Sequence, residues 1–434
     1  MRIFVTGQTT LHWGRIENGN IGNYYITETT FRELHRVFPE AELTTTLQLT
    51  EEFCERENVI VLPMSLFYNW DDRDLELAVK ELGIAYLYSK TGKICETTPY
   101  IDEVLKSDLI LDFSGELWGD HAEPVGKNRF LVGLMKDRVA QLLNKKTALI
   151  ASSEGPFSDP SVKAFAQEVF SKFDLITNRE SMSKELLKEN SFDVSKVYNF
   201  ACPAFLFKSS LDNEMKGIIE NEKIVVSSRK TVGYILCGFN MLDGPYDKFP
   251  RRDDEFIQFA ESIEYIVSKL KARVVLMSHQ NGFENVSGFK LINGRDYPII
   301  KQLHEVIRKR KKISMDDVVC LENPYNPWET KGIIGKFDMF ISGRVHGFVA
   351  SVSQNVPTVL ITRGFGPVSH RNIGFAKSVG LEKYVADPRS SADMIEKIVL
   401  CWNNLDYLRR ELEKKIPQVQ NLVRDGFNML QTII

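Results

Sequence analysis

The sequence predicts an α/β protein built from two doubly wound, Rossmann-like domains. At 434 residues the chain is too long for one ordinary hydrophobic core, so two domains of roughly 200 residues each are expected. Apolar runs of strand length alternate with helical patterns along the chain, which indicates parallel βαβ units. The hydrophobic share of 43% and the charged share of 26% are typical of a globular enzyme.

Strands are expected where a short run rich in Val, Ile, Leu or Phe is bounded by turn residues. In the first half of the chain these runs lie near Ile3–Val5, Val59–Leu62, Leu109–Phe113, Lys146–Ile150, Leu175–Thr177 and Lys196–Tyr198. In the second half they lie near Lys223–Val226, Thr231–Leu236, Val274–Ser278, Val318–Leu321, Met339–Ser342 and Thr358–Ile361. Helical periodicity predicts helices over Ile26–Val37, Asp71–Leu82, Lys127–Leu143, Ser161–Phe173, Met182–Leu187, Asp253–Leu270, Ile300–Arg308 and Phe348–Ser353.

The domain break is expected between Pro203 and Lys223, where the turn Ala201–Pro203 is followed by a polar stretch. We therefore predict an N-terminal domain over residues 1–210, a C-terminal domain over 211–395 and a helical tail over 396–434. Two such domains facing each other across a cleft form the GT-B layout.

The tail combines an apolar stripe with a basic face. The stripe runs through Tyr407, Leu408, Leu412, Ile416, Val419, Leu422 and Val423. The basic residues Arg409, Arg410, Lys414 and Lys415 are interleaved with glutamates, which favours a solvated face. The alternative is that this face contacts anionic lipid; at most peripheral membrane contact is expected.

Charge and cysteine usage exclude several classes of protein. The net charge of −3 and the lack of a basic, aromatic-rich motif argue against nucleic-acid binding. The opening MRIFVTGQ lacks the features of a secretory signal, and no apolar run approaches the ~20 residues that span a bilayer. Six scattered cysteines form no C-x-x-C pair, so neither a metal site nor a disulfide framework is expected. The predicted location is the cytoplasm.

The most informative segment is FDMFISGRVHGFVASVSQNVPTVLI, residues 337–361. An apolar strand ends at Ser342, and Arg344, His346 and Gly347 lie in the turn that leads into a helix. Ligands of open α/β sheets bind at the carboxyl ends of strands, where helices begin. Arginine can hold an anion with two hydrogen bonds, and histidine exchanges a proton near neutral pH. The pattern predicts anion binding joined to acid–base chemistry; the alternative is a helix-capping arginine with a partly buried histidine.

Two further strand ends carry candidate ligand-binding side chains. Asn20 and Asn23 stand in a glycine-containing loop before a helix expected to start near Tyr24, which is either a ligand-binding loop or a tight turn. The strand of DLILDFSGELWG, residues 108–119, is followed by polar and aromatic residues suited to sugar hydroxyls, with an aromatic ring for the pyranose face. These residues are Glu116, Trp118, Asp120 and His121. The alternative is an acidic turn anchored by one tryptophan.

Further cations follow other strands. Arg179, in LITNRES, would ordinarily pair with a neighbouring glutamate, but beside Arg344 it becomes a candidate for the same anion. After the strand that follows Pro357, a glycine-rich segment contributes Arg363, His370, Arg371 and Lys377.

Taken in order, these motifs resemble the polysaccharide pyruvyl transferase family. The resemblance includes GNIGN, SDLILDFSGE, the SSEGP turn, ITNRES, ACPAFLF and, most specifically, DMFISGRVHG with NVPTVLI. It implies a GT-B-like fold and transfer of the enolpyruvyl unit of phosphoenolpyruvate onto a sugar diol, with release of phosphate. No cofactor is implied. The implied partners are phosphoenolpyruvate and a carbohydrate of a cell-surface polysaccharide, or its lipid-linked precursor at the inner membrane face; a homo-oligomer stays open.

The resemblance also implies roles for individual residues. Arg179 and His346 match the family's arginine and histidine, and His346 becomes the catalytic candidate. The family's lysine is not at its expected spacing, and counting back from Phe375 and Gly380 puts Arg371 in its place. Two sets of binding residues follow. The donor, on the C-terminal side, would be held by Arg344, Arg179, Arg371, His370 and Gly347, and the acceptor, on the N-terminal side, by Asn20, Asn23, Glu116, Trp118, Asp120 and His121.

Two other functions remain open at this stage. One is a GT-B glycosyltransferase that uses a nucleotide sugar, for which Asp296 or Glu329 would be available to bind the ribose. The other is a catalytically silent glycan-binding relative. This alternative is retained because the family's lysine is not at its expected position.

Overall fold

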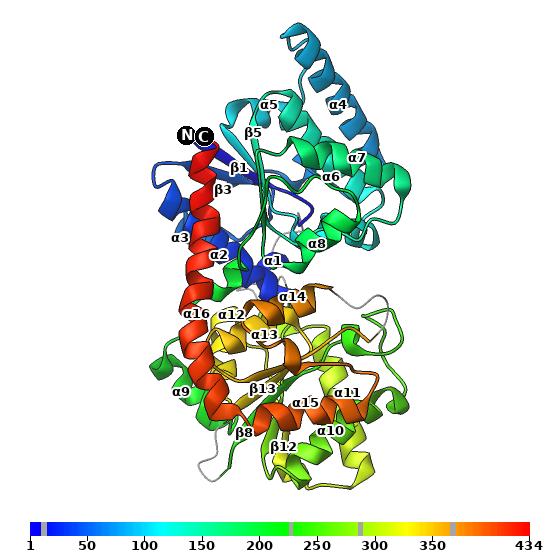
Figure 1. Cartoon of the computed structure of the whole chain (residues 1–434), viewed down its shortest axis with the longest axis vertical. Helices are drawn as coiled ribbons and strands as arrows, with labels where there is room; N and C mark the ends of the chain where they lie inside the picture. The colour runs from blue at the N-terminus through cyan, green and yellow to red at the C-terminus, as the bar shows by residue number, and fades with distance from the viewer. Residues whose placement is uncertain (10–14, 225–228, 285–289, 365–369) are drawn as a thin grey trace. The chain divides into compact units, whose positions relative to one another are not determined.

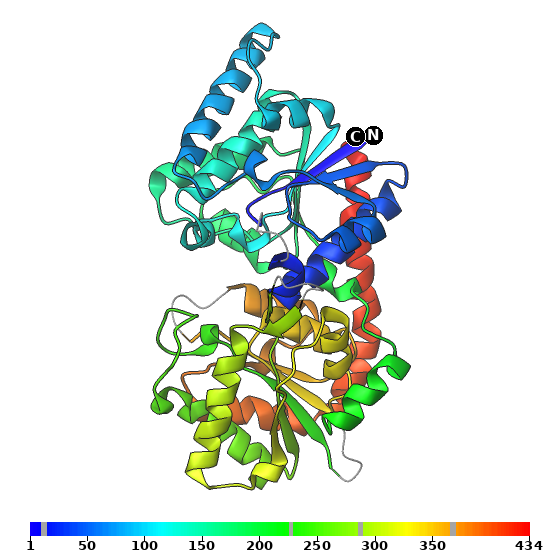
Figure 2. The ribbon, with the colours of Figure 1, turned by 180° about the vertical axis from the view of Figure 1, so that it is seen from behind.

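The computed structural model describes residues 1–9, 15–224, 229–284, 290–364 and 370–434. The chain forms two compact units. The first unit comprises Met1–Ile16, Glu28–Pro203 and Asn421–Ile434, and the second comprises Glu17–Thr27 and Ala204–Gln420. Each unit is built on its own parallel sheet, with helices on both faces (Figures 1 and 2). The predicted class, α/β with two Rossmann-like domains, is therefore confirmed. The predicted assignment of acceptor and donor sides stays a prediction.

The first unit contains a seven-stranded sheet with the order β3-β2-β1-β4-β5-β6-β7. Its strands are β1 (Arg2–Thr6), β2 (Glu42–Thr45), β3 (Val59–Val61), β4 (Leu109–Asp112), β5 (Lys146–Ser152), β6 (Leu175–Asn178) and β7 (Val197–Asn199). Its helices are α3 (Glu51–Glu57), α4 (Arg73–Thr91), α5 (Pro99–Lys106), α6 (Arg129–Leu142), α7 (Pro160–Lys172) and α8 (Met182–Glu189), together with most of α2 (Ile21–Val37). The strand order reverses between β1 and β4, which is where doubly wound sheets bind ligands.

The second unit contains a six-stranded sheet with the order β12-β9-β8-β13-β14-β15, and the order reverses between β8 and β13. Its strands are β8 (Thr231–Ile235), β9 (Arg273–Leu276), β12 (Val318–Cys320), β13 (Met339–Ser342), β14 (Thr358–Ile361) and β15 (Val385–Ala386), and β10 (Asn281–Glu284) and β11 (Lys290–Asn293) form a separate hairpin. Its helices are α9 (Asp212–Asn221), α10 (Ile257–Ser268), α11 (Asp296–Arg310), α12 (Pro327–Ile334), α13 (Val345–Val352), α14 (His370–Ser378), α15 (Ser391–Trp402) and most of α16 (Leu405–Asn428), and the short helix α1 (Arg15–Asn18) is divided between the two units. Helices α10, α11 and α15 cover one face of this sheet, and α9, α12 and α13 cover the other (Figure 1).

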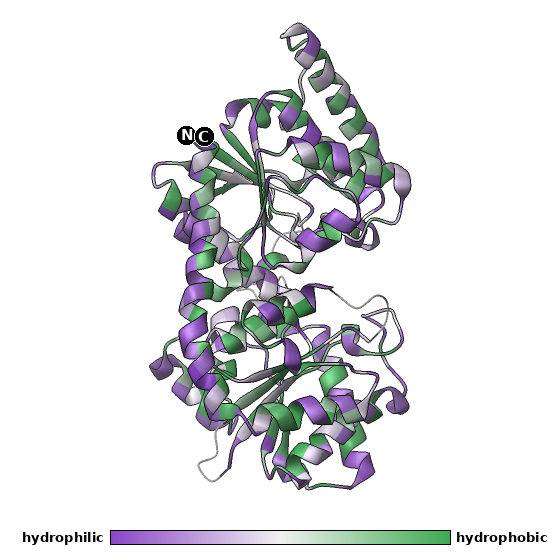
Figure 3. Ribbon diagram, viewed as in Figure 1, coloured by the Kyte–Doolittle hydropathy of each residue, from purple (hydrophilic) through white to green (hydrophobic). Residues whose placement is uncertain are grey.

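Local sequence signals explain where several helices begin. Helices α5, α7 and α12 each start with a proline preceded by a capping residue: Thr98, Asp159 and Asn326. Each of these side chains accepts a backbone N–H of the first turn, and proline is suited to that turn because its missing N–H would have no partner. Hydrophobic residues concentrate on the strands and on the inner faces of the helices (Figure 3).

The structure departs from the predicted elements in a few places. Strand β2 was missed because it is rich in threonine, yet Thr44 and Thr45 are fully buried. The predicted strand Lys223–Val226 lies partly outside the described residues, and Lys223 and Ile224 are not in a strand. Helix α2 begins at Ile21 rather than near Tyr24.

In the tail, the apolar stripe packs inward except at two positions. Leu408, Leu412 and Val419 are buried, whereas Tyr407 and Leu422 are exposed, so the predicted stripe was too wide. Among the helices that the structure describes, none has both the length and the hydropathy needed to cross a bilayer.

Candidate functional site

The first candidate site lies in the second unit, at the switch point between β8 and β13. Arg344 is the residue before the first turn of α13, and His346 lies in that turn. The loops here are tied together by Asn240, whose amide nitrogen donates to the carbonyls of Gly343 (3.0 Å) and Thr362 (3.1 Å). The apolar strand β13 therefore delivers Arg344 and His346 to a fixed position at the carboxyl edge of the sheet.

The stretch of residues 18–23, a loop that leads into the first turn of α2, packs against His346 at Gly22. A Cβ atom on Gly22 would lie 2.5 Å from His346 Nδ1, so only glycine fits there. Asn20 shapes this loop, because its Oδ1 accepts from Gly22 N (3.1 Å) and its carbonyl accepts from Asn23 N (2.9 Å). This stretch is part of the second unit, and Asn20 and Asn23 flank Gly22, the residue that meets His346. Their role in binding stays a prediction.

Arg344 is engaged by a buried carboxylate. Its Nε donates to Asp296 Oδ2 (2.7 Å) and its Nη2 to Asp296 Oδ1 (2.5 Å), while Nη2 also reaches Gln280 Oε1 (2.8 Å). Asp296 is 1% exposed. The Nε–Nη2 edge of the guanidinium is therefore paired with Asp296 and Gln280, and the predicted role of Arg344 in donor binding stays a prediction. The same contact occupies Asp296, the residue considered for ribose binding.

Replacing Arg344 by alanine is expected to lower stability as well as any ligand affinity. The substitution would leave the Asp296 carboxylate buried without its partner, which costs roughly 3–5 kcal/mol. Urea denaturation of Arg344→Ala and of the double variant Arg344→Leu/Asp296→Leu measures this, and the double variant should be the more stable of the two. A single variant as stable as the wild type would contradict the structural role of the pair.

His279 is a residue that the sequence analysis missed. It follows β9 at the same edge of the sheet and is fully buried, with its ring edge-on to Tyr25 at 5.6 Å. Within the described part of the chain, neither ring nitrogen has a hydrogen-bond partner. Burial, together with the charges of Arg344 and His346, lowers the pKa of His279 well below its usual range, so the ring is neutral. The signal available in the sequence was the histidine directly after the apolar run RVVLMS.

Helix α14 carries two further predicted donor-binding residues, Arg371 and His370, and contacts His346 through Phe375. The ring of Phe375 meets that of His346 edge-on at 6.0 Å. Arg371 lies one turn before Phe375, hence on the same face of the helix, and is buried. His370 is the first residue of α14. Part of the predicted cationic loop, residues 365–369, lies outside the described residues.

Gly347 has a packing role that is visible in the structure. A Cβ at this position would lie 2.6 Å from Ser342 Oγ and 3.0 Å from Ile235 Cδ1. The glycine therefore lets the first turn of α13 approach β8 and β13 closely. Its predicted contribution to donor binding is not tested by this contact.

The second candidate site lies in the first unit, where β4, β5 and β6 end side by side. Arg179 follows β6, is buried, and donates from Nε to Ser153 Oγ at 3.0 Å. A Cβ on Gly115 would lie 3.5 Å from Arg179 Nη1, so the loop after β4 runs directly against the guanidinium. Glu116 Oε2 lies 4.0 Å from Nη2.

Two buried glutamates lie near Arg179. Glu180 was considered in the sequence only as an ordinary ion-pair partner, and Glu154 was not singled out. Burial raises the pKa of Glu180, while hydrogen bonds from Ser183 and Met182 oppose the shift. Burial, reinforced by the charge of Glu180, raises the pKa of Glu154 to about 8. A glutamate directly after a buried strand was the available signal, since IASSEGP was noted only as a turn.

Trp118 corrects a prediction about the acceptor. Its side chain is fully buried in a core cluster, edge-on to Phe130 at 5.4 Å and close to Phe170, also at 5.4 Å. The ring presents no face to a sugar, so the expectation that it stacks on a pyranose is wrong. The anchoring alternative is correct, because the loop after β4 turns the indole inward.

The remaining acceptor candidates lie in the same loop. Asp120 Oδ2 accepts from Ser158 N at 2.6 Å, which fixes the neighbouring loop. Asp120 and His121 are partly exposed, and Glu116 is largely exposed. Their contact with a sugar stays a prediction, as does the convergence of Arg179 with the cations of the second unit.

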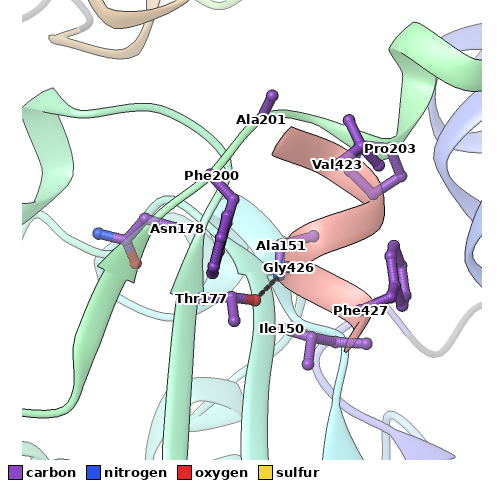
Figure 4. Close-up of a pocket in the computed structure, with 10 residues that line it drawn as sticks. All are labelled: Ile150, Ala151, Thr177, Asn178, Phe200, Ala201, Pro203, Val423, Gly426 and Phe427. Carbon is purple, nitrogen blue, oxygen red and sulfur yellow. Dashed lines mark hydrogen bonds between the residues drawn. The ribbon is translucent and has the colours of Figure 1, made fainter. Parts of the chain in front are cut away.

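A small hollow lies beside this loop cluster (Figure 4). It is lined by Ile150, Ala151, Thr177, Asn178, Phe200, Ala201, Pro203, Val423, Gly426 and Phe427. Its volume of ≈ 10 Å³ leaves room for about one water molecule, so the hollow as it stands is too small for a sugar. Over the described ranges, no cluster of three or more His, Cys, Asp or Glu side chains is arranged to hold a metal ion.

Comparisons with known proteins agree with this architecture. The family description "Polysaccharide pyruvyl transferase" matches residues 20–364, a range that includes Arg179 and His346. The amylovoran biosynthesis protein AmsJ of Erwinia amylovora is 22% identical over 326 residues, which cover 74% of this chain and 71% of AmsJ. A glycosyltransferase from Rickettsia africae superposes with a TM-score of 0.60 at 10% identity, covering 100% of this chain and 98% of the other. The UDP-GlcNAc 2-epimerase of Neisseria meningitidis gives a TM-score of 0.57 at 9% identity, with 100% of both chains covered. These two structures support the GT-B-like fold class.

Proposed function

The chain belongs to the polysaccharide pyruvyl transferase family, and we propose that it moves the enolpyruvyl unit of phosphoenolpyruvate onto a sugar diol. The acceptor would be a cell-surface polysaccharide or its lipid-linked precursor, and phosphate would be released. Polysaccharide biosynthesis is also the process named for the similar AmsJ protein. The proposed place of reaction is the cytoplasm, at the inner face of the membrane for a lipid-linked acceptor.

The observation that carries this proposal is the position of His346. It lies at the switch point of the second sheet, in the first turn of α13, with the backbone of Gly22 against its ring. An imidazole can give and take a proton near neutral pH, and the N-terminal end of a helix favours a bound anion. Both properties suit a doubly anionic donor whose methylene carbon must be protonated.

The proposed reaction has two bond-forming steps. His346 delivers a proton to the methylene carbon, which becomes a methyl group, while positive charge develops at C2 of the donor. A first sugar hydroxyl attacks C2 and loses its proton to the imidazole. A second hydroxyl of the same sugar then displaces phosphate from C2, and its proton leaves with the phosphate or with solvent. The product is a carboxyethylidene ketal, and the proton given by His346 has been restored.

Three cations are proposed to hold the donor. Arg179 offers a buried guanidinium in the first unit, and Arg371 lies on the face of α14 that meets His346. Arg344 contributes positive charge that Asp296 partly offsets. Arginine suits this role because its planar fork matches both phosphate and carboxylate.

Incubation with phosphoenolpyruvate and a panel of polyprenyl-linked sugars tests the proposal. We expect release of inorganic phosphate and, by mass spectrometry, addition of one pyruvate to one acceptor. Parallel reactions with UDP- and GDP-sugars test the glycosyltransferase alternative. Sugar transfer from a nucleotide donor, without any use of phosphoenolpyruvate, would overturn the proposal. Glycan binding without turnover of any donor would instead indicate a silent relative.

A further inference from the structure

The carboxyl edge of the second sheet carries a stack of two aromatic rings. Phe239 and Tyr246 belong to the loop after β8, and their ring centroids are 4.5 Å apart with an interplanar angle of 15°. Arg295 holds Tyr246 in place, because its guanidinium donates to the tyrosine hydroxyl and lies 5.4 Å from the ring centroid. Tyr246 covers one face of Phe239, so the other face is the one that further groups of this edge can meet.

Two arginines approach the Phe239 ring. The guanidinium carbon of Arg363, just after β14, lies 4.7 Å from the ring centroid, and that of Arg344, after β13, lies 5.9 Å from it. All three residues belong to the second unit. A cation–π contact uses the charge of a guanidinium and none of its N–H donors. The ring therefore gathers two cations at the switch point and leaves their N–H groups to other partners.

The backbone on both sides of Arg363 is fixed. Gly364 N donates to the carbonyl of Phe239 at 3.0 Å, so the chain after β14 is bound to the loop after β8. On the other side, the Asn240 amide donates to the carbonyl of Thr362 at 3.1 Å. Arg363 is thus presented from two anchored neighbours, with its partly exposed side chain against the likewise partly exposed Phe239.

The arginines of this edge differ in what neutralises them. Arg344 pairs with the buried carboxylate of Asp296. Over the described ranges, Arg363 forms no ion pair and no side-chain hydrogen bond, and the segments outside those ranges contain no Asp or Glu. The exposed Arg295 also lacks a carboxylate partner in this part of the chain. Positive charge therefore exceeds negative charge here, and the N-terminal end of α13 adds to the positive potential.

We propose that Arg363 is a donor-binding residue that holds the phosphate group of phosphoenolpyruvate in the second unit, with Phe239 as its support. A doubly charged phosphate gains more from this excess of positive charge than the singly charged carboxylate does. A guanidinium can also meet two phosphate oxygens at once. The inference rests on the proposed function, and it adds a fourth cation to the three proposed above.

Titration calorimetry with inorganic phosphate, and separately with pyruvate, tests the proposal without turnover. Arg363→Gln should lower phosphate affinity by roughly ten- to one-hundredfold, as expected when hydrogen bonds to a charged group are lost. Pyruvate affinity should not change. Phe239→Leu should also weaken phosphate binding, because the arginine loses its support. Arg308→Gln is the matched control: it removes one positive charge at the opposite end of α11, where Arg308 pairs with Glu305, and should change neither affinity.

Equal phosphate affinity in Arg363→Gln and in the wild type would overturn the proposal, as would a loss confined to pyruvate or a wild type that binds no phosphate at millimolar concentration. If Arg363→Gln does not fold, labelling of wild-type arginines with phenylglyoxal decides. Phosphate must then protect Arg363 and not Arg308 by mass spectrometry, and equal labelling of Arg363 with and without phosphate refutes the role.

The outcomes for the site and for the reaction are separable. Phosphate binding that depends on Arg363, in a chain that releases no phosphate from phosphoenolpyruvate with any acceptor, would refute the reaction and leave the phosphate site intact. Turnover of phosphoenolpyruvate by Arg363→Gln with an unchanged KM would refute the role of Arg363 and leave the proposed function intact.

Discussion

Replacing His346 by alanine is expected to lower phosphate release from phosphoenolpyruvate by roughly 100- to 10,000-fold, the usual contribution of a positioned acid–base group. The physical reason is the proton that must reach the methylene carbon before C2 can be attacked. The fold should survive, because His346 is only partly buried at the start of α13. Steady-state phosphate release, with thermal denaturation as a check of folding, measures the effect.

His304→Ala is the control for this prediction. That histidine also belongs to the second unit, but its Nε2 lies 3.2 Å from the carbonyl of Val318, away from β13. Gly22→Ala tests the same imidazole through the residue packed against it. The added Cβ would displace the His346 ring and should also reduce turnover. Unchanged turnover in His346→Ala would remove this residue from the mechanism.

Replacing Arg179 by alanine is expected to reduce kcat/KM for phosphoenolpyruvate by about two orders of magnitude. Hydrogen bonds to a charged group contribute about 1.5–3 kcal/mol each, and the guanidinium can offer more than one to an anion. The effect should appear mainly in KM, because the arginine holds the donor and transfers no proton. Arg179→Lys should restore little, since a lysine cannot form the same two-point contact.

Donor affinity, measured by calorimetry without acceptor, separates this role from a structural one. Arg179 also donates to Ser153, so the stability of the variant must be recorded beside its affinity. Ser153→Ala is a companion variant, because it removes this hydrogen bond and keeps the Arg179 guanidinium. Identical affinity for phosphoenolpyruvate in Arg179→Ala and in the wild type would show that the arginine does not bind the donor.

Much of the fold could be predicted from the sequence because the information is local. Most of the apolar runs bounded by turn residues became strands, and Leu109–Asp112 and Met339–Ser342 are fully buried examples. Two examples of elements that escaped prediction lack that signal: β2 is half threonine, and the two strands of the β10–β11 hairpin, NGFE and KLIN, are short and carry few large apolar residues.

The candidate sites could be predicted less completely. Residues after strands were found because the carboxyl edge of a parallel sheet is a general place for ligands. Burial was not foreseen for Trp118, Arg371 or Glu154, because a side chain in a loop can turn either inward or outward. Whether such a side chain is buried depends on which other segments pack against the loop, and the sequence of the loop alone does not carry that information.

The sequence by itself determined the α/β class, the positions of most strands, and the placement of Arg179, Arg344 and His346 at strand ends, since these follow from residue order and periodicity. Only the tertiary structure decided which distant groups meet: Gly22 with His346, Arg344 with Asp296, and Glu154 with Asn178. The physical reason is that hydrogen bonds, desolvation and close packing act over a few ångströms between segments far apart along the chain. They therefore fix the partner and the charge state of each side chain only after the sheets have assembled.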